Sequence, residues 1–196
     1  MDGEVHHFGV VGVANGLAIM ADKETHTLWD HISGEAFKGP LKGKFLATWP
    51  VFITNMESEV SNHQDTQLFS SSYHSPIKWI LGLFSGLMGI NKRGLIPPNF
   101  YRSMSKPIDP RLPKLTQGLG LIVGKRAKYY PMDQIPQGGS IMDLLGKRIM
   151  AIDRSGTDGI PHAVWKNTSE IPMQLLSRWY GFAFTYPNCE IYKREK

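Results

Sequence analysis

An Asn-Gly pair at residues 15 and 16 is the feature that most constrains how this chain can fold. It stands between two β-rich segments, EVHHFGVVGV (4–13) and LAIMADKE (17–24). Asn-Gly readily takes the positive φ angles of a two-residue hairpin turn, so it is the strongest short hairpin signal in a sequence. The sequence therefore predicts an antiparallel hairpin, which THTLW (25–29) extends with a third strand.

The stretch that follows is interrupted by glycine and proline. SGEAFKGPLKGKFLATW (33–49) contains Gly34, Gly39, Pro40 and Gly43. Such spacing favours bends or bulges between extended segments over a regular helix. We therefore expect the first third of the chain to be a meander of short strands.

The middle of the chain, about residues 54–111, is helical and proline-rich in character. ITNMESEVSNH (53–63) predicts a short helix capped by Thr54 or Asn55. From Pro76 to Ile90, apolar residues recur at helical spacing opposite a face of glycine and serine. This pattern indicates either a core helix or an interfacial or lid helix that contacts a pocket or a membrane surface. Its apolar run is shorter than the about 20 residues of a bilayer span, so no transmembrane segment is expected.

The last part of the chain returns to strands. LGLIVGKRAKYYP (119–131) predicts a hairpin that turns at Gly124 and Lys125. MDLLGKRIMAID (142–153) predicts a helical turn or a strand, then a turn at Gly146 and a buried strand. MQLLSRWYGFAFTYPNCEIY (173–192) has helical spacing through Trp179 and Phe182, then a stop at Pro187 and a terminal strand. The predicted fold class is α+β and strand-dominated, with a mostly antiparallel sheet or partly open barrel and a few packed helices. We expect a single domain over residues 1–196, with an excursion at about 54–111.

Charge and cysteine content narrow the function classes. The net charge is +5 and the pI about 9.3, but the basic residues are scattered along the chain, so we expect no nucleic-acid partner. A lone cysteine, Cys189, excludes a disulfide or C-x-x-C pair within the chain, and we expect it to be an ordinary half-exposed residue. The N-terminus carries no secretory signal pattern, which favours a cytoplasmic protein or a fragment of an exported one.

Polar residues that could carry chemistry concentrate in ETHTLWDHISGEAFKGPLKG (24–43). The candidate acid and base residues are His31, Asp30 and Glu35, although no fixed spacing selects them. The candidate ligand-binding residues are Trp29, Thr25, His31 and Tyr130, and the metal candidates are His6, His26 and His31. His26 and His31 would face opposite sides of one strand, so a shared metal requires a bend between them. No phosphate-loop, zinc or hydrolase signature indicates a cofactor or reaction.

The opening segment resembles the prokaryotic domain-of-unknown-function 3179 family. The family pattern runs as F-G-V-x-G, a strand that ends in an aspartate, T-x-[ST]-L-W and G-E-A-x-x-G-P-L-x-G. The matching positions are Phe8, Gly9, Val10, Gly12, Asp22, Thr25, Thr27, Leu28, Trp29, Gly34, Glu35, Ala36, Gly39, Pro40, Leu41 and Gly43. The later segments GLIVGKRAKYYPMDQI, IMDLLGKRIMAI and RWYGFAFTYPNCEIY are also similar to the family, in the same order.

In that family a C-P-x-C element usually precedes F-G-V, and this chain starts just after that place. The resemblance therefore implies no thiol chemistry for the chain as given. We expect a small-ligand-binding or partner-binding domain. The alternatives are a hydrolase-like or metal-assisted enzyme that uses His31 with Asp30 or Glu35, and a fragment of a longer thiol-redox or metal-dependent protein. The oligomeric state is not predicted.

Overall fold

The computed structural model describes residues 3–63, 65–67, 100–168 and 170–194. Contacts divide the chain into two units, Met1–Thr54 with Phe100–Lys196, and Asn55–Asn99. A single domain over residues 1–196 stays a prediction. The helix expected from Pro76 to Ile90, with its contact to a pocket or a membrane surface, lies outside the described residues.

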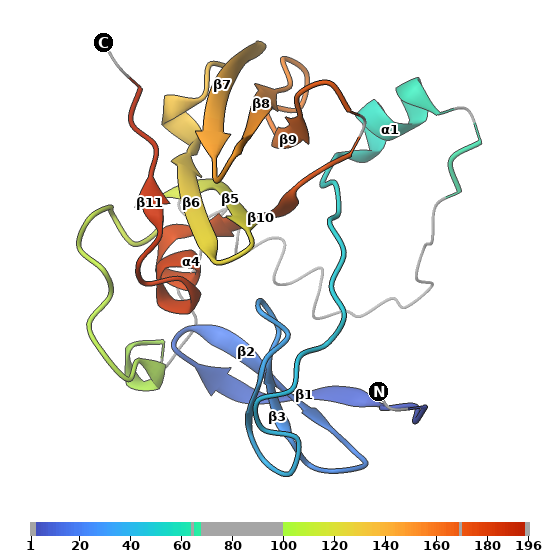
Figure 1. Cartoon of the computed structure of the whole chain (residues 1–196), viewed down its shortest axis with the longest axis vertical. Helices are drawn as coiled ribbons and strands as arrows, with labels where there is room; N and C mark the ends of the chain where they lie inside the picture. The colour runs from blue at the N-terminus through green and yellow to red at the C-terminus, as the bar shows by residue number, and fades with distance from the viewer. Residues whose placement is uncertain (1–2, 64, 68–99, 169, 195–196) are drawn as a thin grey trace, which may run out of the picture. The chain divides into compact units, whose positions relative to one another are not determined.

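The N-terminal sheet of the first unit is the predicted meander (Figure 1). Its four antiparallel strands follow chain order: β1 (Phe8–Ala14), β2 (Leu17–Asp22), β3 (Leu28–Asp30) and β4 (Ala36–Lys38). Asn15 and Gly16 join β1 to β2 with φ angles of 55° and 73°. Both values are positive, as a tight hairpin turn requires, so the predicted hairpin is confirmed.

The hairpin turn is anchored to a short 3-10 helix, η1 (Tyr101–Ser103). The backbone N–H of Asn15 donates to the carbonyl of Ser103 at 2.7 Å, and that of Gly16 donates to the Ser103 hydroxyl at 2.9 Å. Phe100, beside the turn, packs edge-on against Tyr180 with ring centroids 4.9 Å apart. These contacts hold the end of the N-terminal hairpin against the helix that carries Tyr180.

Two further sheets make up the rest of this unit. One has the order β10 (Met173–Arg178), β5 (Gln117–Val123), β6 (Arg126–Pro131), β11 (Glu190–Ile191), and only β11 pairs in parallel. The other consists of β7 (Gly139–Leu145), β8 (Arg148–Arg154) and β9 (Pro161–Trp165), all antiparallel. The 3-10 helix η2 (Met132–Gln134) follows β6. The predicted hairpin at Gly124 and the predicted turn at Gly146 are confirmed, and the segment before Gly146 is a strand. No closed barrel occurs among the described strands.

The two sheets share a core because alternate residues of β5 and β6 point to it. Leu119, Leu121 and Tyr130 meet the third sheet there, and the whole cluster is Leu119, Leu121, Tyr130, Ile135, Leu145, Met150, Ile152, Ala163 and Trp165. Buried Gln174 on β10 links the sheets: its side-chain oxygen accepts from the backbone N–H of Ala163 at 2.8 Å. A strand-dominated α+β fold with mostly antiparallel sheets is thus confirmed.

The opposite face of β5 and β6 packs on the helix α4 (Trp179–Thr185). Tyr129 and Phe182 lie at the centre of this second cluster, with ring centroids 5.2 Å apart. Gly120 of β5 faces the same helix, and a Cβ atom there would overlap the ring of Phe182. Helix and sheet approach this closely only because β5 presents no side chain at that point.

The second unit is described for the short helix α1 (Met56–Asn62) and a few residues after it. Asn55 is its N-cap, and its side-chain oxygen accepts from the backbone N–H of Ser58 at 2.8 Å. The helix predicted within 53–63 and its Asn55 cap are therefore confirmed. Over the described ranges, no helix is long and apolar enough to span a membrane.

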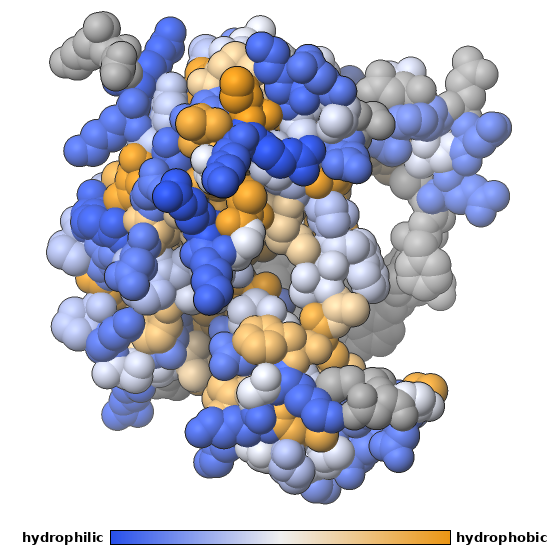
Figure 2. All heavy atoms as spheres, viewed as in Figure 1, coloured by the Kyte–Doolittle hydropathy of each residue, from blue (hydrophilic) through white to orange (hydrophobic). Residues whose placement is uncertain are grey.

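Strand β1 is an edge of its sheet and carries apolar side chains that stay exposed. Val10, Val11 and Val13 keep more than half of their surface accessible. Figure 2 shows hydrophobic residues reaching the surface over the N-terminal sheet, next to hydrophilic ones. Among the described strands only β2 pairs with β1, so β1 lies at an edge of the sheet.

The close contact between β5 and α4 predicts a cost for any side chain at Gly120. We expect Gly120→Ala to lower the free energy of unfolding by about 1–3 kcal/mol, because the ring of Phe182 must move out of a packed core. Urea unfolding followed by circular dichroism measures the change. Gly9→Ala is the matched control, since a Cβ on that strand glycine meets nothing within 4 Å. Equal stability of the two variants would contradict the packing described here.

Candidate functional site

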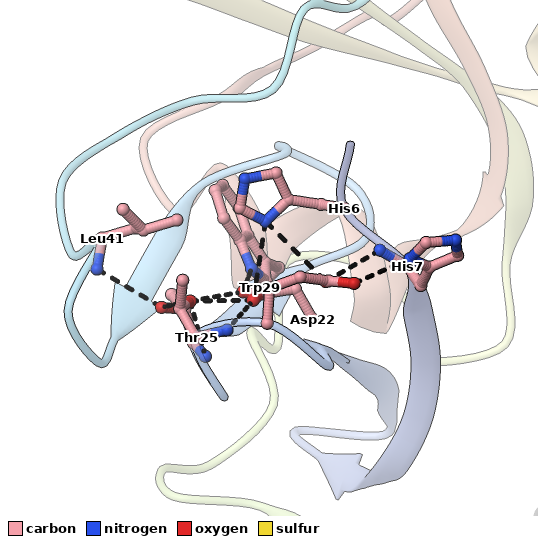
Figure 3. A network of polar contacts seen from close by, with 8 residues as sticks. His6, His7, Asp22, Thr25, Trp29 and Leu41 are labelled. Atoms are coloured by element: carbon pink, nitrogen blue, oxygen red, sulfur yellow. Dashed lines mark hydrogen bonds and ion pairs between the residues drawn. The ribbon is translucent and has the colours of Figure 1, made fainter. Parts of the chain in front are cut away.

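A buried carboxylate, Asp22, organises the N-terminal sheet (Figure 3). It ends β2 and is fully buried. Its Oδ2 accepts from the indole N–H of Trp29 at 2.8 Å, and its Oδ1 accepts from the backbone N–H of Thr25 at 2.6 Å. The Thr25 hydroxyl also lies within 2.9 Å of both carboxylate oxygens and 2.6 Å from the hydroxyl of Thr27. The turn between β2 and β3 thus wraps around one charge.

Two effects set the pKa of Asp22 in opposite directions. Burial raises the pKa, because it disfavours the charged form. The hydrogen bonds from Trp29 and Thr25 favour that form and outweigh burial, so the pKa lies well below its ordinary value. Asp22 is therefore an ionised carboxylate at neutral pH, inside the fold.

Two histidines and a second carboxylate stand beside Asp22. Nδ1 of His6 lies 3.6 Å from Oδ1 of Asp22 and 4.0 Å from Oε2 of Glu24, and the side chain of His6 is only 7% exposed. The backbone N–H of His7 donates to Oε2 of Glu24 at 2.9 Å, and its ring Nδ1 lies 2.7 Å from Oε1. These His7 contacts lower the pKa of Glu24 to about 2. His6, Asp22 and Glu24 form a cluster of one imidazole and two ionised carboxylates.

A pocket of about 410 Å³ lies at the other end of the same sheet, next to α4. Asp30, Ser33 and Glu35 contribute its polar groups. The full lining is Ala14, Asn15, Leu17, Ala18, Ile19, Asp30, Ser33, Glu35, Phe37, Phe45, Phe184, Thr185 and Tyr186. Oδ1 of Asp30 accepts from the backbone N–H groups of Ile32 and Ser33 at 2.7 and 3.0 Å, which fixes its side chain in the turn after β3.

The predicted acid and base residues divide between the pocket and the surface. Asp30 and Glu35 both line the pocket, as the sequence suggested they could. His31 is exposed, lies outside that lining, and has its Nδ1 2.8 Å from the carbonyl oxygen of Ala18. Of the predicted metal candidates, His6 belongs to the carboxylate cluster, whereas His26 lies exposed in the β2–β3 turn and His31 on the far side of β3 from that turn.

Most of the predicted ligand-binding residues make contacts inside the fold. Thr25 and Trp29 meet at Asp22, and Trp29 is fully buried. Tyr130 is also fully buried, and its hydroxyl donates to Oδ2 of Asp143 at 2.7 Å. Contact of these residues with a ligand stays a prediction.

Asp22 and Glu24 were not predicted from the sequence to be site residues. The family pattern includes an aspartate at a strand end, which Asp22 matches, and this match was the one indication in the sequence that Asp22 matters. Residue contacts across the sheet, and not a sequence spacing, bring both to His6. Phe184 of α4 and Tyr186 directly after it lie far along the chain from the sheet, and no sequence pattern connected them with the pocket.

The expectation for Cys189 was wrong. It is 3% exposed and packs in the cluster with Tyr129 and Phe182. Burial raises the pKa of its thiol, and the nearby Arg111 lowers it less. The residues around Cys189 are mostly polar, so the sequence indicated exposure. Cys189 is buried because the chain turns back there from α4 to pair with β6.

The buried pair of Asp22 and Trp29 predicts a graded loss of stability. Trp29→Phe removes one donor from a buried carboxylate and should cost about 1–3 kcal/mol. Trp29→Ala also leaves a cavity and should cost about 3–5 kcal/mol. Chemical unfolding measures both changes. Trp49→Phe is the control, because Trp49 is 73% exposed, and a comparable loss there would contradict this account.

Asp143 gives the fold a predicted dependence on acid pH. Burial raises its pKa, but Lys128 at 2.6 Å and the Tyr130 hydroxyl outweigh burial and bring the pKa below its ordinary value of 3.8. The stabilisation is therefore complete above that pH and is lost as pH falls through the lower pKa of the folded state. Melting temperatures should fall more steeply with acid for the wild type than for Asp143→Asn. The exposed Asp133→Asn should behave like the wild type; identical curves for all three would refute the assignment.

Comparison with known proteins identifies a family and no closer relative. A family model described as "Protein of unknown function (DUF3179)" matches residues 1–175. No curated protein and no solved structure matches the chain. The match covers most of the chain and includes both the Asp22 cluster and the strands that line most of the pocket. The chain belongs to the DUF3179 family of proteins of unknown function.

Proposed function

We propose that this protein is a small-ligand-binding domain without thiol redox chemistry of its own, and that its pocket takes a small organic cation with an apolar body. The observation that carries the proposal is the composition of the pocket beside α4. Two carboxylates, Asp30 and Glu35, share it with the aromatic side chains of Phe37, Phe45, Phe184 and Tyr186.

Charge complementarity favours a cation. Among the described residues that line the pocket there is no lysine, arginine or histidine, so the two carboxylates have no neutralising side chain in the lining. An ammonium group would supply that charge and form charge-assisted hydrogen bonds, which are stronger than neutral ones. Aromatic faces also attract cations and cover apolar parts of a ligand.

Size and rigidity are consistent with this ligand class. A volume of about 410 Å³ falls within the usual range for small-molecule sites. Asp30 is oriented by two backbone N–H groups, and the hairpin turn at Asn15, another lining residue, is hydrogen-bonded to η1. Burial and the charge of Asp30 raise the pKa of Tyr186, so its hydroxyl stays protonated and available as a donor.

The position of His31 favours binding over acid–base catalysis. His31 is exposed and outside the pocket lining, so a reaction that uses it with Asp30 or Glu35 has no shared cavity to support it. The buried Cys189 with its raised pKa is a poor nucleophile, which supports a role without thiol chemistry.

The test compares three probes of one shape and different charge. Protonated 2-phenylethylamine, neutral 2-phenylethanol and anionic 3-phenylpropionate are titrated into the full chain, with ligand-observed NMR as the readout. We expect the amine to bind best. Glu35→Gln and Asp30→Asn should each weaken its binding by roughly tenfold or more, the loss of one charge-assisted contact.

Glu170→Gln is the matched control for charge, because Glu170 is exposed and lies outside the pocket lining. Equal binding of the three probes, or an equal effect of Glu170→Gln and Glu35→Gln, would overturn the assignment to an organic cation. Binding of the anion alone would point to a different site.

A further inference from the structure

The geometry points to a divalent-metal site of the zinc class, formed by Nδ1 of His6 with carboxylate oxygens of Asp22 and Glu24. This site goes beyond the proposed ligand pocket, since none of the three residues lines that pocket. It also differs from the set that the sequence suggested, which joined His6 to His26 and His31.

The spacing of the three side chains fits one ion. Their ligand atoms all lie within 4.8 Å of one another. Nδ1 of His6 is 3.6 Å from Asp22 and 4.0 Å from Glu24. Bonds of about 2.0–2.2 Å to zinc in tetrahedral geometry place neighbouring ligand atoms about 3.3–3.6 Å apart, so small side-chain shifts close the site.

An independent observation at His6 supports binding of an ion at this place. Its side chain is 7% exposed, and its buried Nδ1 has no hydrogen-bond partner among the described residues. The contacts at 3.6 and 4.0 Å are too long to be hydrogen bonds. Buried polar nitrogens are normally satisfied, and an ion between His6 and the carboxylates would satisfy this one.

Asp22 retains capacity for a metal bond in spite of its many contacts. An ionised carboxylate offers about four lone-pair sites. The backbone N–H of Thr25 and the indole N–H of Trp29 occupy two of them. The Thr25 hydroxyl has a single proton, so it can donate to only one carboxylate oxygen although it lies near both. One lone pair therefore remains for an ion.

The surroundings orient the ligands as they do in known metal sites. Outer-shell hydrogen bonds hold ligating groups in place: Trp29 and Thr25 hold Asp22, and His7 holds Glu24. The negative charges of the Asp22 and Glu24 carboxylates balance a divalent cation. Mixed nitrogen and oxygen ligands suit zinc better than calcium or magnesium, which prefer oxygen. Glu24 is 32% exposed, so water can complete the coordination.

The test measures zinc itself. The tag-free full chain is dialysed against chelator, then titrated with zinc chloride in a calorimeter at neutral pH, with magnesium and calcium as comparison ions. We expect one zinc per chain, no comparable binding of the other two ions, and a higher melting temperature with zinc. His6→Gln and Glu24→Gln should each weaken zinc binding by about tenfold or more.

The matched controls are His26→Gln and His31→Gln, the same substitution at exposed histidines. They should bind zinc as the wild type does. Loss of binding in the controls, or its retention in His6→Gln and Glu24→Gln, would overturn the site in favour of adventitious surface binding. Absence of zinc binding in the wild type would also overturn the proposed site.

A second measurement on the wild type avoids any dependence on variant folding. Nitrogen-15 NMR of the histidine rings reports which ring nitrogen binds metal. Zinc should shift the Nδ1 resonance of His6 and leave His26 and His31 unchanged. Shifts confined to other histidines would refute the assignment.

Discussion

The N-terminal sheet depends on the burial of one charge. An ionised carboxylate inside a protein is costly unless hydrogen bonds replace its water, and at Asp22 the donors come from Trp29 and Thr25. To deliver them, the chain must turn directly after β2 and return as β3 with the indole pointing inward. The contact network therefore fixes the turn, the strand pairing and the position of Trp29 together.

The same hydrogen-bond network includes many of the residues that match the family pattern. The Thr27 hydroxyl lies 2.6 Å from that of Thr25 and accepts from the backbone N–H of Leu41 at 3.3 Å. Gly39 has a φ of 117°, and a Cβ there would come within 2.7 Å of the Cα of Thr27. Threonine, tryptophan and glycine thus meet at one place, where each supports the carboxylate or makes room for the chain that covers it.

Local sequence patterns predicted much of the fold. The remaining features depend on contacts between residues far apart in the sequence and could not be predicted. The Asn15–Gly16 hairpin, the Asn55 cap and the turns at Gly124 and Gly146 follow from residues adjacent in sequence, and each is confirmed. The parallel pairing of β11 with β6 and the burial of Cys189 arise from contacts that no local pattern encodes.

The candidate sites follow the same division. Asp30 and Glu35 are close in sequence, and reasoning from sequence named both. The grouping of His6 with Asp22 and Glu24 could not be predicted without the fold of the sheet. From the sequence, Asp22 was expected only to end a strand. The aromatic wall from α4 needed the packing of a distant helix against β5, which a sequence pattern cannot supply.

The missing side chain at Gly120 of β5 has a consequence for the width of the pocket. Gly120 admits Phe182. Phe184 and Thr185 at the end of the same helix, with Tyr186 directly after it, form one wall of the pocket. The depth at which α4 seats on the sheet therefore sets how wide the pocket opens. For the proposed ligand pocket, a substitution at Gly120 is therefore expected to change the width of the pocket without changing any of its lining residues.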